Sequence, residues 1–357
     1  MKRIAVVVGT RGELIGMAPV IKEAEKRGHR TLFIHTGQHY DSVLYRNLLA
    51  DLELPKPDYF FGRGPKSHGR HIARALTKIE RILLDEKPDI VLAQGNNNAT
   101  VASALACVVT ETPLGHVEAG VRHNYFLGDT NRRLVERAAR HCFAPFKEAA
   151  LNLAEDGIPR DRICLAGDTY LDAAKLYSNK IRSSRVLERL RLTGQSKPLV
   201  IVSVHTAPHR EPKFLRRFLD ELRSLDCNVV WTLHPAIEKR LDRISSSRLL
   251  GKVKLSPSVT YSDFHHLLSH SSCVITDSGV TQEEAYLHGK PCIAFVNQEV
   301  RSSPYPMLIR EGWIRILNDL SKLAELLDSV MRKRLGKPDL RIFGDGKASR
   351  RILDVFR

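Results

Sequence analysis

Short apolar runs alternate with helical patterns along the first half of the chain. Runs rich in β-branched residues predict buried strands at residues 3–8, 31–35, 89–93 and 114–117. Between them, apolar residues spaced three and four apart predict helices at residues 17–27, 70–86 and 100–110. Strands that alternate with helices in this way are typical of a parallel, doubly wound sheet.

The same alternation restarts after a charged, serine-containing segment at residues 175–198. Strands are predicted at residues 198–204, 228–233, 272–276 and 291–296, and helices at residues 213–224, 261–269 and 282–287. We therefore predict an α/β chain with two Rossmann-like domains, at residues 1–175 and 198–340. Two such domains that face each other across a cleft form the architecture called GT-B.

Polar loops follow six of these strands. They are residues 9–13, 94–98 and 118–122 in the first half, and His205, His234–Pro235 and residues 277–279 in the second. Ligands of open α/β sheets bind beyond the carboxyl ends of the strands. The chemistry of the chain is therefore expected in these loops, where the two domains face the cleft.

Length and composition agree with two globular domains. A chain of 357 residues exceeds what one hydrophobic core usually serves, and 43% hydrophobic with 27% charged residues is ordinary for a globular protein. No apolar run approaches the ~20 residues that span a bilayer. The short apolar run at the N-terminus leads directly into a glycine turn, so it is interpreted as a strand and not as a signal peptide. The six cysteines form no CxxC pair, which is typical of free thiols in a reducing cytoplasm.

The net charge of +16 favours an anionic partner. A phosphorylated substrate, an acidic membrane surface and nucleic acid are the candidates. Basic residues cluster at 182–191, 210–217, 239–248 and 331–337, where solvated helix faces are the ordinary explanation. Nucleic acid is the least supported partner, because the sequence has no RNA-binding signature with interleaved aromatic residues.

Residues 276–285 form the most informative motif, in which a strand ends in a glycine turn and a helix begins. The amides and positive dipole of a helix start suit a phosphate, to which Ser278 can add a hydroxyl donor. Glu283 or Glu284 can accept from the two neighbouring hydroxyls of a ribose. The alternative is a helix cap made by Asp277 or Ser278, and the pattern does not choose between the two interpretations.

Glu118 is a candidate for acid–base chemistry because it emerges at a strand end. Burial and the nearby Arg122 can set the pKa of its carboxyl group. The alternative is a structural ion pair between Glu118 and Arg122. Arg11 follows the first strand, where a guanidinium can hold a phosphate with a fork of donors.

Two histidines follow strands of the second half at equivalent places. His205 and His234 can contact a diphosphate or act as acids. His265, His266 and His270 lie in a helical pattern and are predicted to be surface or packing residues. The sequence contains no metal-ligand spacing, no dinucleotide-binding glycine fingerprint and no P-loop, so no metal or nucleotide cofactor is expected.

These stretches together resemble the non-hydrolysing UDP-N-acetylglucosamine 2-epimerase family along nearly the whole chain. The matching pieces occur in family order, at residues 9–11, 17–19, 36–41, 115–120 with 122, 131–132, 166–169, 205, 233–235, 276–279, 282–284, 289–291 and 343–349.

The resemblance implies a GT-B fold, a UDP-sugar substrate and usually a cytoplasmic homodimer. The last stretch, residues 341–357, is expected to cross back onto the first domain as a helix. The family is understood to eliminate UDP, giving a 2-acetamidoglucal, and to add it back with inverted C2, without nicotinamide or metal. The predicted substrate-binding residues are Arg11, Gln38, His39, Arg122, His234, Asp277, Ser278, Gly279, Glu283 and Glu284.

The chain departs from the family pattern where the sugar chemistry is expected. Asn96 stands where the family's His-Gly-Asp-Thr motif has a catalytic aspartate. The family's Pro-Glu-Glu segment is replaced by a stretch that contains Asp129, which is left as the candidate second acid. A lysine usual in the first helix is replaced near Gly16. The predicted catalytic positions are Glu118, Asp129, His205 and Asn96.

Three functions remain open at this point. The first is a divergent 2-epimerase that interconverts UDP-N-acetylglucosamine and UDP-N-acetylmannosamine. The second is a GT-B glycosyltransferase, which needs only one base and would draw an anionic or membrane-held, lipid-linked acceptor to its basic face. The third is a nucleotide-sugar-binding protein without catalysis.

Overall fold

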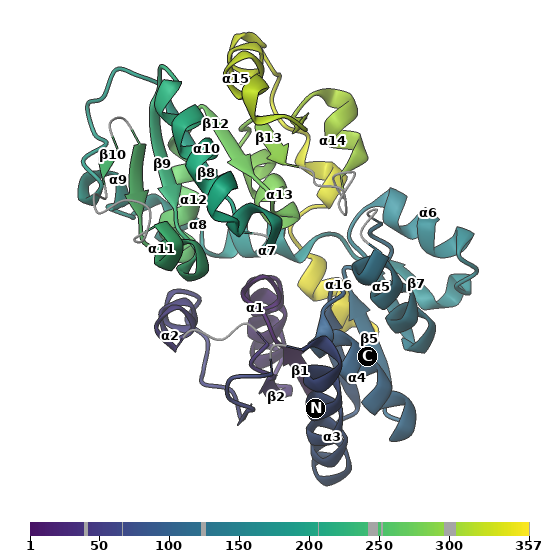
Figure 1. Cartoon of the computed structure of the whole chain (residues 1–357). Coiled ribbons are helices and arrows are strands. Elements are labelled where there is room, and N and C mark those ends of the chain that lie inside the picture. The colour runs from purple at the N-terminus through teal and green to yellow at the C-terminus, as the bar shows by residue number, and fades with distance from the viewer. Residues whose placement is uncertain are drawn as a thin grey trace. The chain divides into compact units, whose positions relative to one another are not determined.

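The computed structural model describes residues 1–38, 42–65, 67–122, 126–205, 207–241, 249–250, 253–295 and 305–356. The chain divides into two compact units, residues 1–177 with 340–357, and residues 178–339. Each unit contains a seven-stranded sheet with helices packed against it (Figure 1). The prediction of two α/β sheets is therefore confirmed.

The first unit is a parallel doubly wound sheet in the strand order β3-β2-β1-β4-β5-β6-β7. Its strands are β1 (Arg3–Val8), β2 (Arg30–His35), β3 (Tyr59–Phe60), β4 (Ile90–Gln94), β5 (Leu114–Val117), β6 (His141–Ala144) and β7 (Ile163–Leu165). β1 lies between β2 and β4, and the strand order reverses there. Residues 4–8 of β1 are fully buried, as expected for a strand that is covered on both faces.

The helices of the first unit connect its strands or, in the case of the last two, follow β7 in the chain. They are α1 (Arg11–Lys26), α2 (Ser42–Asp51), α3 (His68–Glu86), α4 (Asn98–Val109), α5 (Phe126–Ala138), α6 (Lys147–Glu155), α7 (Thr169–Leu176) and α16 (Ala348–Asp354), with the 3-10 turns Arg160–Arg162 and Leu340–Phe343. α16 packs on α1 and α7. Its first turn is anchored by the buried Asp172, which accepts hydrogen bonds from Ala348 N (3.1 Å), Ser349 N (2.8 Å) and Ser349 Oγ (2.7 Å).

Helix α1 begins six residues before the predicted start at Met17. The reason is a capping box: Thr10 accepts from Glu13 N (3.4 Å), while Glu13 accepts from Thr10 N (2.8 Å). The capping box lies outside the apolar periodicity, which is why the pattern predicted the helix too short. Arg11 is thereby the first residue of the helix, and Gly16 lies inside it.

The second unit has the strand order β10-β11-β9-β8-β12-β13-β14. Its strands are β8 (Leu199–Ser203), β9 (Asn228–Thr232), β10 (Leu249–Leu250), β11 (Val253–Ser256), β12 (Cys273–Thr276), β13 (Cys292–Phe295) and β14 (Ile314–Leu317). Neighbouring strands are parallel except for β10, which runs antiparallel to β11. The doubly wound pattern thus continues to β14, beyond the last predicted strand.

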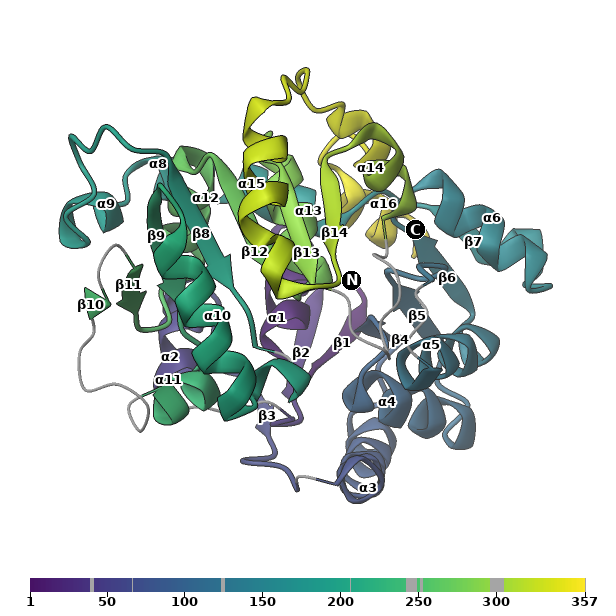
Figure 2. The ribbon, with the colours of Figure 1, turned by 45° about the horizontal axis from the view of Figure 1, so that its top comes forward.

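The helices of the second unit are α8 (Ser178–Arg182), α9 (Val186–Arg189), α10 (Pro212–Ser224), α11 (Pro235–Leu241), α12 (Tyr261–His270), α13 (Gly279–Leu287), α14 (Pro306–Glu311) and α15 (Leu323–Arg332), with the 3-10 turns Ala207–Arg210 and Leu320–Lys322. α10 and α15 lie over the same face of the sheet (Figure 2). α8 and α9 pack on α12. Among the described residues, no helix is both long and apolar enough to cross a membrane.

Candidate functional site

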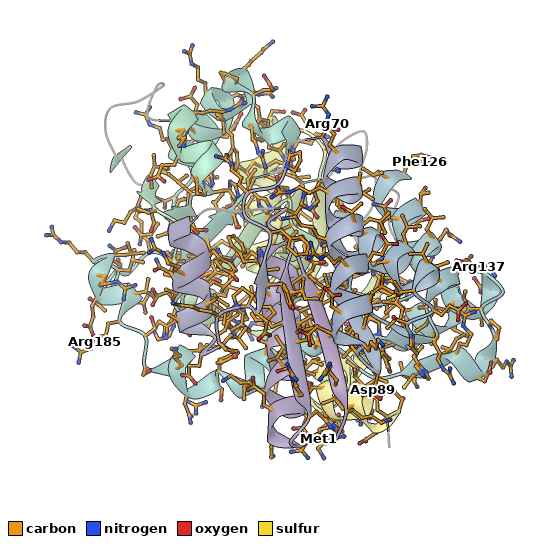
Figure 3. The ribbon with its side chains drawn as sticks, turned by 90° about the horizontal axis from the view of Figure 1, so that it is seen from below. Met1, Arg70, Asp89, Phe126, Arg137 and Arg185 are labelled. Carbon is orange, nitrogen blue, oxygen red and sulfur yellow. The ribbon has the colours of Figure 1, made fainter. Side chains whose placement is uncertain are left out.

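The loops at the carboxyl end of the first sheet gather the predicted polar residues of the first unit. Figure 3 shows Arg70 and Phe126, at the starts of α3 and α5, at the end of this unit opposite Met1 and Asp89. Met1 and Asp89 lie beside the starts of β1 and β4. The helices therefore begin where the strands end, which places the loops after β1, β4 and β5 at one edge, as expected for this fold.

Glu118 is fixed in this edge through both its backbone and its side chain. Its φ angle is +64°, a left-handed conformation that costs a non-glycine residue about 1–2 kcal/mol. The buried Arg132 donates to the Glu118 carbonyl oxygen and lies 3.4 Å from its Oε1. Gln94 Nε2 lies 3.4 Å from the other carboxylate oxygen, Oε2. A strained residue held by several neighbours is characteristic of functional sites.

Arg122 is not the partner of Glu118, so the ion pair considered from the sequence is wrong. The Arg122 guanidinium donates to Glu136 Oε2 (2.6 Å) and to Asp156 Oδ2 (2.7 Å). Burial lowers the pKa of Arg122, but the hydrogen bonds to Glu136 and Asp156 outweigh it and raise that pKa. Arg122 therefore holds the loop against α5 and α6. Its predicted contact with substrate stays a prediction.

Asp129 lies in the same arginine cluster, on the first turn of α5. Its Oδ2 accepts from Arg133 Nε at 2.8 Å, and its Oδ1 lies 4.0 Å from Arg122 Nε. No contact with Glu118 is found within the described part of the chain. Asp129 thus shares its carboxylate with two arginines, and its role as a second acid stays a prediction.

Asn96 and its neighbours begin α4. Asn97 caps the helix by accepting from Ala99 N at 2.9 Å, and the Asn96 carbonyl accepts from Asn131 Nδ2 at 3.0 Å. Gln38 lies beside them, since its Oε1 accepts from Ala99 N at 3.3 Å. The structure therefore brings Asn96 and Gln38 to the same edge as Glu118. His39 lies outside the described residues.

Gln94 occupies space that a side chain at position 16 would need. A Cβ added at Gly16 would overlap three atoms of the Gln94 side chain. The glycine in α1 and the glutamine at the end of β4 are therefore complementary, and together they place an amide against Glu118. The sequence marked position 16 as a departure from the family pattern and placed Gln94 in a polar loop, but it did not show that the two residues touch.

Glu13 is a buried acid of this edge that sequence reasoning missed. Its carboxylate accepts from Gly9 N (2.6 Å) and from Thr100 Oγ1 (3.1 Å). Burial raises the pKa of Glu13 to about 7, against these hydrogen bonds, which lower it. The capping-box pattern of Thr10 and Glu13 was the signal that could have found it. Arg11, next to this turn, is exposed on the first turn of α1.

Gly120 shapes the loop that carries Glu118, and its replacement by alanine should destabilise the first unit by about 3 kcal/mol. Gly120 has a φ of +81°, and an added Cβ would overlap the backbone carbonyl of Ala149 on α6. Urea unfolding of Gly120→Ala measures the effect. Gly28→Ala is the matched control, because Gly28 has a φ of +72° and nothing within 4 Å of an added Cβ. Equal losses in the two variants would contradict the overlap.

In the second unit, Asp277 gathers the predicted histidines at the ends of β8, β9 and β12. The Asp277 side chain is 2% exposed, and its two oxygens each accept from His205 N at 3.0 Å. His205 Nδ1 lies 3.4 Å from Oδ1, and the ring of His205 stacks on that of His234 with centroids 5.7 Å apart. Three residues predicted from separate strands therefore form one cluster.

His209 completes this cluster and was missed from the sequence. Its Nδ1 lies 2.8 Å from Asp277 Oδ2, and its ring is buried against Phe214 and Phe295. A carboxylate that binds the Nδ1 side of a histidine fixes the ring and stabilises its charged form. Asp277 can therefore fix the orientation of the His205 ring. Among the described residues, no group of three or more His, Cys, Asp or Glu side chains is arranged to hold a metal ion.

Ser278 and Gly279 begin α13, directly after Asp277. Ser278 accepts from Thr281 N at 3.4 Å, so it is the helix cap that the sequence allowed. Asp277 is not the cap. Further along the helix, Glu283 accepts from Tyr305 OH (2.6 Å) and Glu284 lies 3.1 Å from His265 Nε2. Both glutamates are buried and hydrogen-bonded within the unit.

Comparisons with known proteins agree with this arrangement. A family model described as UDP-N-acetylglucosamine 2-epimerase matches residues 22–357. The UDP-N-acetylglucosamine 2-epimerase of Methanococcus maripaludis is 30% identical over 369 residues, which cover 99% of this chain and 98% of that protein. The UDP-2,3-diacetamido-2,3-dideoxy-D-glucuronate 2-epimerase of Pseudomonas aeruginosa is also 30% identical, over 99% of this chain and 98% of that protein.

A solved structure matches the whole chain as well. It is the crystal structure of the Methanocaldococcus jannaschii UDP-GlcNAc 2-epimerase in complex with UDP-GlcNAc and UDP, with a TM-score of 0.88 and 27% identity. The match covers 99% of each chain. It confirms the GT-B-type fold predicted from the sequence.

Proposed function

This chain belongs to the UDP-N-acetylglucosamine 2-epimerase family, and we propose on that premise that it inverts C2 of a UDP-linked 2-acetamido sugar. The observation that carries the proposal is the retained Glu118, which Arg132 and Gln94 hold at the carboxyl edge of the first sheet. A carboxylate fixed in this way is suited to move a proton at the sugar.

The reaction has two halves that balance each other. In the first, the proton on C2 is removed, the bond between C1 and the diphosphate oxygen breaks, and a C1–C2 double bond forms, which gives a 2-acetamidoglucal and UDP. In the second, UDP adds back to C1 and a proton is delivered to the opposite face of C2. Glu118 serves one of these proton transfers, and a second acid serves the other.

The second unit is proposed to bind the UDP. The helix start at Ser278 and Gly279 offers amides and a positive dipole to a phosphate. His205, oriented by Asp277, adds a ring donor that stabilises the charge of the departing diphosphate. His234, stacked on His205, extends this surface.

Proton NMR in heavy water tests the reaction directly. The chain is incubated with UDP-N-acetylglucosamine alone, and the expected result is deuterium at C2 together with the manno epimer. UDP-2,3-diacetamido-2,3-dideoxyglucuronate is the second substrate, because one relative is named for it. No exchange with either sugar, and UDP release only after an acceptor is added, would instead indicate a glycosyltransferase. Saturable UDP binding without any turnover would indicate a binding protein.

We also propose that the chain is a homodimer that pairs through α4 and its neighbours α3 and α5. These helices are in contact and expose large apolar side chains, namely Leu84, Leu105, Val108, Val109 and Leu134. Such a group of exposed apolar residues is characteristic of an interaction surface. Buried free thiols suit the reducing cytoplasm proposed for this assembly.

Charges placed on α4 should separate the dimer. Leu105 and Val109 lie one turn apart on that helix, so Leu105→Glu with Val109→Glu is expected to halve the mass measured by light scattering after size exclusion. Leu151→Glu on α6, which is 61% exposed, is the control and should leave the mass unchanged. A monomeric native chain would contradict the proposal.

A further inference from the structure

A row of three polar side chains lies inside the second unit and joins α12 to α13. We propose that His265 and His288 are positioning residues that hold the Glu284 carboxylate in the orientation in which it binds the ribose hydroxyls of UDP. The inference rests on the proposed function, because it assumes that this unit binds UDP. It adds two histidines that lie away from the cluster around Asp277.

The geometry forms a continuous row of hydrogen bonds. His265 Nε2 lies 3.1 Å from Glu284 Oε1, and His265 Nδ1 lies 2.9 Å from His288 Nε2. His265 is completely buried, and Glu284 is 4% exposed. The Tyr261 ring lies 4.1 Å from the His265 ring, centroid to centroid, and limits its rotation. A buried imidazole with both nitrogens engaged has a fixed orientation and fixes its partners in turn.

The direction of the hydrogen bonds follows from the chemistry of the groups. An ionised carboxylate only accepts, so His265 Nε2 carries a proton and donates to Glu284. If the His265 ring carries this one proton only, its Nδ1 accepts, and His288 Nε2, 2.9 Å away, is the donor. Burial lowers the pKa of His288 to about 3, so His288 stays neutral near pH 7. His288 therefore fixes the tautomer of His265, and His265 fixes Glu284.

Glu284 is well placed along α13 for a ribose. It follows Ser278 by six residues, which is about 9 Å along a helix axis and of the order of the separation between a diphosphate and its ribose hydroxyls. The neighbouring Glu283 accepts a hydrogen bond from Tyr305 OH at 2.6 Å, whereas Glu284 is joined to His265. Because His265 binds Oε1 of Glu284, the other carboxylate oxygen, Oε2, is the one that would bind the ribose hydroxyls.

Calorimetric titration of the full chain with UDP and with 2′-deoxy-UDP and 3′-deoxy-UDP tests this inference. His265→Phe removes the donor to Glu284 and is expected to weaken UDP binding by about 10- to 100-fold. For a deoxy analogue that lacks the hydroxyl bound by Glu284, the same substitution should weaken binding much less. His265→Gln can restore a donor near the Nε2 position and should recover most of the affinity. His288→Phe acts only through His265 and should give a smaller loss with the same dependence on the ribose.

His266→Phe is the matched control, because His266 is the next residue on α12 but its Nδ1 lies 2.8 Å from the Ile181 carbonyl. It should leave the ratio of UDP to deoxy-UDP affinity unchanged. If His265→Phe weakens all three ligands equally, or if His265→Gln recovers nothing in a folded protein, the inference is wrong. If the native chain binds UDP but does not epimerise, only the proposed reaction fails. If it binds no UDP, both proposals fail.

Discussion

Replacing Glu118 by glutamine is expected to lower the rate of C2 epimerisation by about 10²- to 10⁴-fold while leaving UDP affinity within about twofold. An amide has the shape of the carboxylate but cannot exchange a proton at neutral pH. The contacts that hold position 118 come from Arg132 and Gln94, neither of which belongs to the unit proposed to bind UDP. The loss should therefore fall on kcat and on deuterium exchange at C2.

Single-turnover measurements with UDP-N-acetylglucosamine in heavy water, paired with UDP titration, separate the two effects. Unchanged exchange in Glu118→Gln would remove Glu118 from the mechanism. Asp129→Asn tests the second acid. A loss of epimerisation rate comparable to that of Glu118→Gln, in a folded variant, would assign that role to Asp129. A small loss would mean that Asp129 only pairs with Arg122 and Arg133. Asn96→Asp is the complementary variant, and a gain in rate would show that the asparagine limits the native chain.

The fold could be predicted from the sequence because its strands are short and buried on both faces. Val6, Leu92 and Ile275 lie in continuous apolar runs, which is the pattern that parallel sheets produce. The start of α1 could not be predicted in this way, because it depends on hydrogen bonds between Thr10 and Glu13 that periodicity does not register. β14 was missed because its exposed Arg315 interrupts the apolar run.

Candidate residues could be predicted where each follows a strand in its own loop. They were missed where their place in the site depends on contacts with residues from other elements. Asp277 and His205 could be placed because each follows a strand. The predicted Glu118–Arg122 pair was wrong because both residues have other partners on α5. Arg122 binds Glu136, and Glu118 contacts Arg132. His265 lies inside a helical pattern, where a histidine bonded to a carboxylate looks the same as one that merely packs. His209 lies between the predicted strand at residues 198–204 and the predicted helix at residues 213–224, where no pattern singles it out.

Replacing Asp277 by alanine is the second large change, and it is expected to weaken UDP binding at least tenfold and to lower the unfolding free energy of the second unit by about 3 kcal/mol. Asp277 accepts from the His205 amide and faces Nδ1 of both His205 and His209. Its removal takes away the acceptor that faces the His205 amide and the buried His209 ring, and lets the His205 ring turn away from the orientation proposed for the diphosphate.

Calorimetric UDP titration and urea unfolding measure the two losses separately. Asp277→Asn keeps one oxygen that can accept from the His205 amide, so it should recover part of the stability. It should recover less of the affinity, because a single amide oxygen cannot serve both His205 and His209 as the two carboxylate oxygens do. Asp172→Ala is the matched control, because Asp172 is also a buried carboxylate with several donors, but it anchors α16 in the first unit. It should lower stability and leave UDP affinity unchanged. If both alanine variants weaken UDP binding equally, the effect comes from general loosening of the chain and not from the histidines that Asp277 orients.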